Sequence, residues 1–373
     1  MSDMPASLAA LLAQLDRQGI TDHRRYREVR KFLQFKARET DTPISGSFEL
    51  TPLCNLDCKM CYVHLHKQQL GSARLLDTAT WKHLMKQAVD AGMMYASLTG
   101  GECLTHPGFR ELFLFLQELG IETRIFSNGI LMDADMLDFL KENPPASVQI
   151  TLYGASEEAY ERVTGHRAFS RVMDNILKLR DAKIPLTIAV TPNAYMEDGE
   201  DVLRLLHSLG LPSRINSGLM APRKETGRII TDANQEYIRL IKLQLALDGK
   251  VPAEDCDEES LPDVGGSGNA EYGVRCGAGR SSFCISWDGR IRPCNTFPGV
   301  SEDILSSSFL AGWKRINEQV KQFPLPIECV GCKYTQVCKH CVAEHAANAP
   351  IGHASPVVCQ CIRQMAAEGI IHL

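Results

Sequence analysis

Short β-like runs alternate with amphipathic helical stretches from residue 46 to about residue 250. The predicted strands are 47–52, 94–102, 123–129, 147–154, 185–193 and a last one near 213–219. The predicted helices are 77–92, 106–120, 132–143, 156–165, 169–183, 198–210 and 232–249. Asp77 is the expected N-cap of the first of these helices and Gly92 its end.

About six βα units in a row imply a parallel sheet with helices outside it, either a doubly wound sheet or a partial barrel. Polar and glycine residues follow several of the strands. The cysteine-rich stretch 54–63 follows the first strand, 100–102 the second and 127–129 the third. Because a parallel barrel builds its active site at the C-terminal ends of its strands, we expect these three segments to meet.

The two flanks of this pattern differ from it. Residues 1–45 look helical and are predicted to form a short N-terminal cap. Residues 251–275 include the stretch AEDCDEESLPDVGGSGN, which is rich in acid and glycine and indicates a linker or lid. From residue 276 to residue 373, cysteine spacing replaces hydrophobic periodicity, which favours a small cysteine-rich C-terminal domain.

Charge and hydropathy exclude several classes of function. The 373 residues carry a net charge of −5, with Lys and Arg scattered, so we expect no nucleic-acid partner. No apolar run approaches the roughly 20 residues that span a bilayer, so we expect no membrane partner. The N-terminus lacks the basic and apolar regions of a signal peptide, and a cytoplasmic location is therefore predicted.

The fourteen cysteines are the unusual part of the composition. In a reducing cytosol they point to metal or cluster ligation rather than to disulfides. Three lie near the start, Cys103 stands alone, and ten more lie between Cys256 and Cys361.

The stretch CNLDCKMCYV (54–63) holds three cysteines with no fourth nearby. A structural zinc site is closed by four ligands. Three cysteines suit a [4Fe-4S] cluster better, because one iron then stays open to an exogenous molecule. Zinc with His64 or His66 as the fourth ligand is the alternative.

The CxxxCxxC loop, followed by TGGE (99–102) after the next strand, resembles the radical S-adenosylmethionine (SAM) enzymes. The resemblance covers about residues 46–250 and implies a partial (β/α)6 TIM-type barrel. In that family the open iron chelates the amino and carboxylate groups of SAM. An electron from the cluster then cleaves SAM to methionine and a 5′-deoxyadenosyl radical, which abstracts a substrate hydrogen.

The resemblance also assigns residues. It makes Cys54, Cys58 and Cys61 the cluster ligands, and Gly100, Gly101 and Glu102 the contact with the methionine amino group. Glycines allow close backbone approach, and a carboxylate can pair with an ammonium. The further SAM contacts it implies are Ser127, Asn128, Gln149 and Thr151 at the ribose, Arg162 at the carboxylate, and Thr191 and Asn193 near adenine. Surface or strand-end polarity is the alternative for the last five of these.

Two positions depart from the family pattern. Met60 stands where an aromatic residue is usual, although a polarizable thioether can still pack on adenine. Cys103 stands where proline is common after GGE. It is either a small buried residue or a catalytic thiol that faces the radical and donates a hydrogen atom.

The C-terminal cysteines occur in CGAGRSSFCISWDGRIRPC (276–294), in CVGCKYTQVCKHC (329–341) and at Cys359 and Cys361. The order, with a hairpin-like WDGR turn in the first segment, resembles the SPASM domain, which holds two auxiliary iron–sulfur clusters, here expected to be [4Fe-4S]. The last interval of the second segment is two residues, whereas the family usually has three. Zinc knuckles are the alternative.

The SPASM resemblance divides these cysteines into two ligand sets. Cys276, Cys294 and Cys341 would hold the first auxiliary cluster, with Cys284, Cys256 or an iron open to substrate in the fourth place. The second cluster would be held by Cys329, Cys332, Cys338 and Cys359, with Cys361 as the rival for the last place.

These resemblances predict an enzyme that modifies a peptide or protein, by crosslinking or oxidation, as in the maturation of ribosomally made peptides. A flavodoxin or ferredoxin is the expected electron donor. One alternative is a radical SAM dehydrogenase or epimerase acting on a peptide or small molecule. A non-catalytic iron–sulfur carrier or zinc-binding redox sensor is the alternative of another class.

Overall fold

The structure is a computed structural model that describes residues 7–70, 75–216, 234–249, 273–338 and 341–372. Within these residues one sheet has nine strands in the order β6-β5-β4-β3-β2-β1-β7-β8-β9. The strands are β1 Ser45–Glu49, β2 Tyr95–Thr99, β3 Glu122–Ser127, β4 Ser147–Thr151, β5 Leu186–Val190, β6 Ser213–Ile215, β7 Ser282–Ile285, β8 Arg290–Arg292 and β9 Glu302–Asp303.

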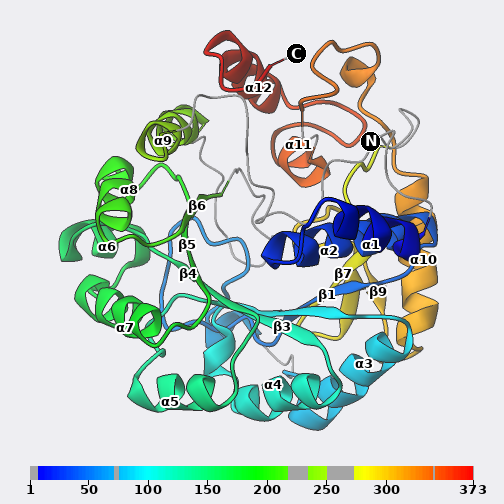
Figure 1. Ribbon diagram of the computed structural model, residues 1–373, viewed down its shortest axis with the longest axis horizontal. Coiled ribbons are helices and arrows are strands. Elements are labelled where there is room, and N and C mark those ends of the chain that lie inside the picture. Colours follow the sequence, from blue (N-terminus) through cyan, green and yellow to red (C-terminus); the bar gives the residue numbers. More distant parts are fainter. Residues whose placement is uncertain (1–6, 71–74, 217–233, 250–272, 339–340, 373) are drawn as a thin grey trace.

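Strands β1 to β6 are parallel, and each pairs with the next one in the sequence. A row of helices covers the outer side of this curved part of the sheet (Figure 1). These helices are α3 Thr78–Asp90, α4 Phe109–Glu118, α5 Ala134–Glu142, α6 Glu157–Thr164, α7 Phe169–Asp181 and α8 Gly199–Ser208. Helix α9 (Asn234–Leu247) follows β6 in the chain. The predicted partial (β/α)6 barrel is confirmed.

Local sequence explains these elements. Asp77 caps α3 as predicted, because its Oδ1 accepts a hydrogen bond from Thr80 N at 2.8 Å. Burial alternates along β4: Val148 and Ile150 lie in the core under the helices, whereas Gln149 on the opposite face is half-buried. The helix side of the sheet is therefore apolar, and polar side chains point toward the barrel interior.

The cysteine-rich region contributes to the same sheet. β7 pairs in parallel with β1, and the register sets Ser45 opposite Ser282. β8 pairs antiparallel with β7, so the predicted WDGR hairpin is confirmed. Phe283 on β7 packs edge-on against Phe48 of β1, with ring centroids 6.0 Å apart, and Phe309 of α10 (Phe309–Lys321) packs on Phe283. Strand β1 therefore lies between β2 of the barrel and β7 of the cysteine-rich region.

The remaining helices form smaller units. Helices α1 (Leu8–Arg17) and α2 (His23–Glu39) pack on each other within the predicted N-terminal cap. Near the other end, α11 (Val342–Asn348) precedes α12 (Pro356–Ala367), and α12 packs on α9 (Figure 1). Short 3-10 turns span Lys67–Leu70, Cys103–Thr105 and Ile327–Cys329. No helix among the described residues has both the length and the apolar character needed to cross a membrane.

Part of the predicted organisation lies outside the described residues. This holds for positions 217–219 of the last predicted strand and for the predicted linker up to residue 272. Cys256, one of the residues weighed as a fourth ligand, belongs to that segment.

Candidate functional site

The loop that carries the first three cysteines leaves β1 and is clamped by helix α6. Asp57 N donates to Thr164 O at 2.9 Å, and Lys59 N donates to Val163 O at 3.0 Å. Both acceptors belong to the last turn of α6, where backbone carbonyls have no partner within the helix. The end of this helix therefore fixes the middle of the cysteine loop.

The three cysteines lie at different depths in this loop. Cys58 is buried, and Cys54 and Cys61 are half-buried. Burial, the charge of Glu102 and the charge of Cys61 raise the pKa of the Cys54 thiol to about 12. Amides already point at two of the sulfurs: Leu56 N donates to Cys54 Sγ at 3.4 Å, and His64 N donates to Cys61 Sγ at 3.3 Å. Such thiols ionise when they bind a metal, and sulfurs that accept amide hydrogens fit the ligands of an iron–sulfur cluster.

Gly100 and Gly101 bring a second loop against the entrance of the cysteine loop. Gly101 N donates to Thr51 O at 2.7 Å. A Cβ on Gly100, which has φ +145°, would lie 2.4 Å from Thr51 O, and one on Gly101 would lie 2.4 Å from Leu53 O. Only glycine allows this approach, so these residues act here through contact between two backbones.

Glu102 is 1% exposed, and its carboxylate joins the turns after β2 and β3. It accepts hydrogen bonds from Ser127 Oγ at 3.0 Å, from Asn128 N at 2.7 Å and from Leu104 N at 3.1 Å. Burial raises the pKa of Glu102, while these donors act in the opposite direction. These donors fix the carboxylate within the chain, and its expected pairing with the ammonium of SAM stays a prediction.

Asn128 continues this network to the cysteines. Its Nδ2 donates to Asn55 Oδ1 at 2.7 Å and to Cys54 Sγ at 3.6 Å. Ser127 Oγ also accepts from Gly129 N at 3.0 Å, which shapes the turn after β3. The three segments expected to meet after the first three strands do lie together.

The other predicted SAM contacts are more dispersed. Gln149 and Thr151 are half-buried on β4. Past β5, Thr191 Oγ1 accepts from Asn216 Nδ2 at 2.9 Å, and Asn193 Nδ2 donates to Thr191 O at 2.9 Å.

Arg162 lies on α6 and forms an ion pair with Glu197, and both side chains are exposed. Unlike the residues on β4 and after β5, Arg162 therefore lies at the surface, where the carboxylate of Glu197 balances its charge.

Cys103 is completely buried among apolar side chains of the core. Its Sγ donates to Phe126 O at 3.3 Å, and burial, followed by the charge of Glu102, raises the pKa of the thiol. This placement corresponds to the small buried residue of the two alternatives. Met60 is half-buried and packs against the same core.

His64 and His66, considered as zinc ligands beside the cysteines, turn toward Asp57. Each has a ring nitrogen 3.6 Å from Asp57 Oδ1, and the two rings stack edge-on with centroids 4.7 Å apart. Both histidines therefore share an acidic neighbour in the same loop.

The C-terminal cysteines fall into two groups linked by their charges. In the first, burial raises the pKa of Cys294 to about 11, and the charge of Cys276 adds to it. Burial also raises the pKa of Cys341, and the charges of Glu344, Cys276 and Cys294 add to it. This is the set that the resemblance assigned to the first auxiliary cluster.

The second group contains Cys329, Cys332, Cys338 and Cys359. Burial and the charges of the other three raise the pKa of Cys329 to about 11. Cys361, the rival of Cys359, lies instead in a separate apolar cluster with Ile238, Met365 and Ile370. Cys284 is completely buried on β7, opposite Ser47 of β1.

Two tyrosines near the cysteine loop were not predicted from the sequence. Tyr153 follows β4 and Tyr160 lies on α6, and their rings pack edge-on with centroids 5.9 Å apart. Burial raises the pKa of both hydroxyls, and Cys58 is the charge that adds most. No motif spacing marks these residues, because their proximity to the cysteines arises only when α6 packs on the loop.

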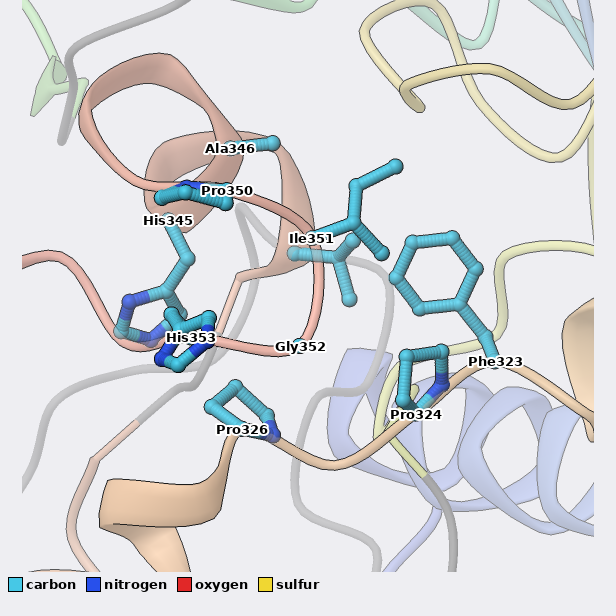
Figure 2. Close-up of a pocket in the computed structure, with 10 residues that line it drawn as sticks. Phe323, Pro324, Pro326, His345, Ala346, Pro350, Ile351, Gly352 and His353 are labelled. Carbon is cyan, nitrogen blue, oxygen red and sulfur yellow. The ribbon is translucent and has the colours of Figure 1, made fainter.

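A small hollow in the C-terminal region is separate from this site. Phe323, Pro324 and Pro326 line one side, and Ile351 and His345 line the other (Figure 2). It has room for about one water molecule, which is too little for a substrate or for SAM.

Comparison with known proteins agrees with the fold and with the cysteine loop. Residues 48–206 match the family model described as the radical SAM superfamily. This part of the chain therefore carries a radical SAM domain. A radical SAM domain implies SAM and a [4Fe-4S] cluster as cofactors.

Two curated relatives are, by name, a peptide cyclase and a maturation protein. The PqqA peptide cyclase of Ruegeria pomeroyi is 29% identical over 286 residues, which cover 70% of this chain and 71% of that protein. The sporulation killing factor maturation protein SkfB of Bacillus subtilis is 32% identical over 157 residues, which cover 42% of this chain but only 37% of that protein.

Among solved structures, Streptococcus suis SuiB bound to S-adenosylmethionine is similar with a TM-score of 0.66. The sequences are 17% identical, and the match covers 94% of this chain and 86% of that chain. This likeness extends through the cysteine-rich region and concerns the fold.

Proposed function

We propose that this radical SAM enzyme modifies a peptide or protein, by crosslinking or oxidation, starting from the removal of a substrate hydrogen atom. The observation that carries the proposal is the clamped cysteine loop, which lies at the C-terminal end of the parallel strands beside the Glu102 network. The peptide substrate is supported by the names of the relatives: a PqqA peptide cyclase, SkfB, and SuiB, of which one structure is bound to precursor peptide SuiA.

Cys54, Cys58 and Cys61 would hold the cluster. When bound and reduced, the cluster and SAM supply the 5′-deoxyadenosyl radical that takes the hydrogen atom. The residues of the chain orient these groups: Glu102 ties the loops after β2 and β3 together, and Asn128 fixes Cys54 through Nδ2. Gln149 and Thr151 are the proposed contacts on the open side of β4.

Two auxiliary [4Fe-4S] clusters are the proposed occupants of the C-terminal cysteine groups. The first group would use Cys276, Cys294 and Cys341, and the second Cys329, Cys332, Cys338 and Cys359. Such clusters would accept the electron that an oxidised or crosslinked product leaves behind. A flavodoxin or ferredoxin is the proposed electron donor to the cluster of Cys54, Cys58 and Cys61. The proposed compartment is the cytoplasm, which keeps thiols reduced.

Anaerobic reconstitution with iron, sulfide, dithionite and SAM tests the activity. The wild-type chain should form 5′-deoxyadenosine and hold about twelve irons, four for each of three clusters. Cys58→Ala should lose about four irons and all product above background. The matched control is Cys361→Ala, which removes a cysteine from an apolar cluster and should keep both. Product formation by Cys58→Ala would contradict the proposed site.

The substrate class needs its own experiment. A peptide encoded beside the gene, deuterated at its side chains, should transfer deuterium into 5′-deoxyadenosine and change in mass. Cleavage of SAM without any such transfer would leave a radical SAM enzyme that acts on another substrate, and would therefore contradict the peptide proposal alone.

A further inference from the structure

Tyr160 is completely buried on α6, one turn before the carbonyls that clamp the cysteine loop. Its ring packs edge-on against Tyr153. Among the residues that the structure describes, none forms a hydrogen bond with Tyr160 Oη. Buried hydroxyls in proteins are almost always hydrogen-bonded, so this one calls for a partner that the polypeptide does not provide.

The surroundings of the hydroxyl identify that partner. Thr164 O and Val163 O hold Asp57 N and Lys59 N, so α6 and the cysteine loop keep a fixed relative position. Tyr160 and Cys58 lie in the same buried cluster, and after burial itself Cys58 and Cys54 contribute most to the raised pKa of the Tyr160 hydroxyl. Burial keeps the phenol protonated, so toward a sulfur it can act only as a donor.

We propose that Tyr160 Oη donates a hydrogen bond to a sulfur of the cluster held by Cys54, Cys58 and Cys61, and that this bond raises the cluster's reduction potential. The inference rests on the proposed function, because it requires a cluster at this loop. A hydrogen bond to sulfur stabilises the reduced cluster more than the oxidised one, since reduction adds negative charge. Tyr160 therefore makes it easier to load the electron that SAM cleavage consumes.

The test is a redox titration of the reconstituted enzyme, followed by electron paramagnetic resonance on the signal that changes when SAM is added. Tyr160→Phe should lower the equilibrium constant for one-electron reduction about tenfold, which is ~59 mV toward more negative potential. The matched control is Tyr95→Phe. Tyr95 begins β2, at the end opposite the cysteine loop, and its ring contact with Arg30 survives in phenylalanine. An unchanged potential in Tyr160→Phe would overturn the inference.

A second variant keeps the hydroxyl and should shift the reduction potential in the opposite direction. 3-Fluorotyrosine at position 160 is a stronger donor, so the potential should move in the positive direction, which a purely structural role of Tyr160 would not produce. A shift of zero, or one in the same direction as that of Tyr160→Phe, would overturn the inference. Iron content and 5′-deoxyadenosine formation by the wild-type chain are measured first. Their absence would refute the proposed function, whereas their presence with no shift would refute only the role of Tyr160.

Discussion

The two cysteine-bearing regions of this molecule are built on different supports. The loop of Cys54–Cys61 follows β1, is clamped by α6 and lies beside the buried Glu102 network. The segment of Cys329–Cys338 is held mainly by its own short turns, such as Cys332 N to Cys329 O at 3.3 Å and Cys338 N to Tyr334 O at 2.8 Å. Next to these turns, Ile327 and Val330 are 64% and 73% exposed.

This difference indicates two ways to make a metal site. The barrel shapes the first site through its own contacts, so a cluster bound there would add little to the stability of the fold. The C-terminal turns bury little apolar surface, so a bound cluster would itself supply much of their stability.

Removal of iron should have the largest effect on the difference between the two regions. After chelation, amide protection in the Cys329–Cys338 segment should fall at least about tenfold more than protection in the Cys54–Cys61 loop. The reason is that Asp57 N and Lys59 N keep their partners on α6 without metal. Hydrogen exchange followed by mass spectrometry measures both segments in one sample. Equal loss in both would show that the barrel site also depends on its metal.

Cys359 and Cys361 offer a matched pair within α12. Cys359→Ala should remove about four irons per chain and lower the protection of the Cys329–Cys338 segment. Cys361→Ala should keep all the iron and cost only about 1 kcal/mol of unfolding free energy, for a small cavity among Ile238, Met365 and Ile370. Iron analysis and thermal unfolding check the pair, and loss of iron from Cys361→Ala would exchange the two assignments.

Glu102→Gln tests how much the hydrogen bonds of the Glu102 carboxylate stabilise the barrel around the cysteine loop. Whichever way the amide points, its NH2 group faces either Leu104 N or Asn128 N, so one buried donor loses its acceptor. We expect a loss of about 2 kcal/mol in the free energy of unfolding, measured by denaturant titration. Glu111→Gln, at an exposed ion pair with Lys82, is the control and should change it by less than about 0.5 kcal/mol. Similar values for both variants would mean that the network does not support the loop.

The smallest effect is expected where the N-terminal segment meets α10. Asp41 pairs with Lys321, and its φ of 51° is tolerated by asparagine, so Asp41→Asn removes charge with little backbone effect. Burial raises the pKa of Asp41, but Lys321, Asn317 and Arg280 together bring it below its usual value of 3.8. The ionised pair should contribute about 1 kcal/mol at pH 7.

That contribution is present above pH 3.8 and is lost as the pH falls through the lowered pKa of the folded state. Wild type and Asp41→Asn should therefore approach equal stability when denaturant titrations are repeated at successively lower pH below 3.8. A difference that stays constant with pH would mean that the carboxylate charge is not what stabilises this junction.

Much of the barrel follows from local patterns, whereas its long-range contacts do not. Apolar spacing and the cap at Asp77 define α3 from nearby residues alone. The pairing of β7 with β1 joins segments more than 230 residues apart. The sequence SFCI (282–285) predicts a strand at most, and it does not indicate which strand it pairs with.

The same limit applies within the site. Cysteine spacing predicts the loop, and GGE predicts the glycine contact, because each depends on adjacent residues. The donors of Glu102 lie 25 and 26 residues away at Ser127 and Asn128, and Tyr160 reaches the cysteines only through the packing of α6. These contacts depend on the angles between packed elements, which residue spacing does not encode.

The place of β1 between β2 and β7 has a consequence for synthesis of the protein. The ribosome makes β1 early, but its second neighbour emerges more than 230 residues later. At roughly 5–20 residues per second, the strand that leads into the cysteine loop keeps one open edge for about 10–50 s. An unpaired edge of this kind invites wrong partners, so the nascent chain is open to aggregation along β1 until β7 has emerged.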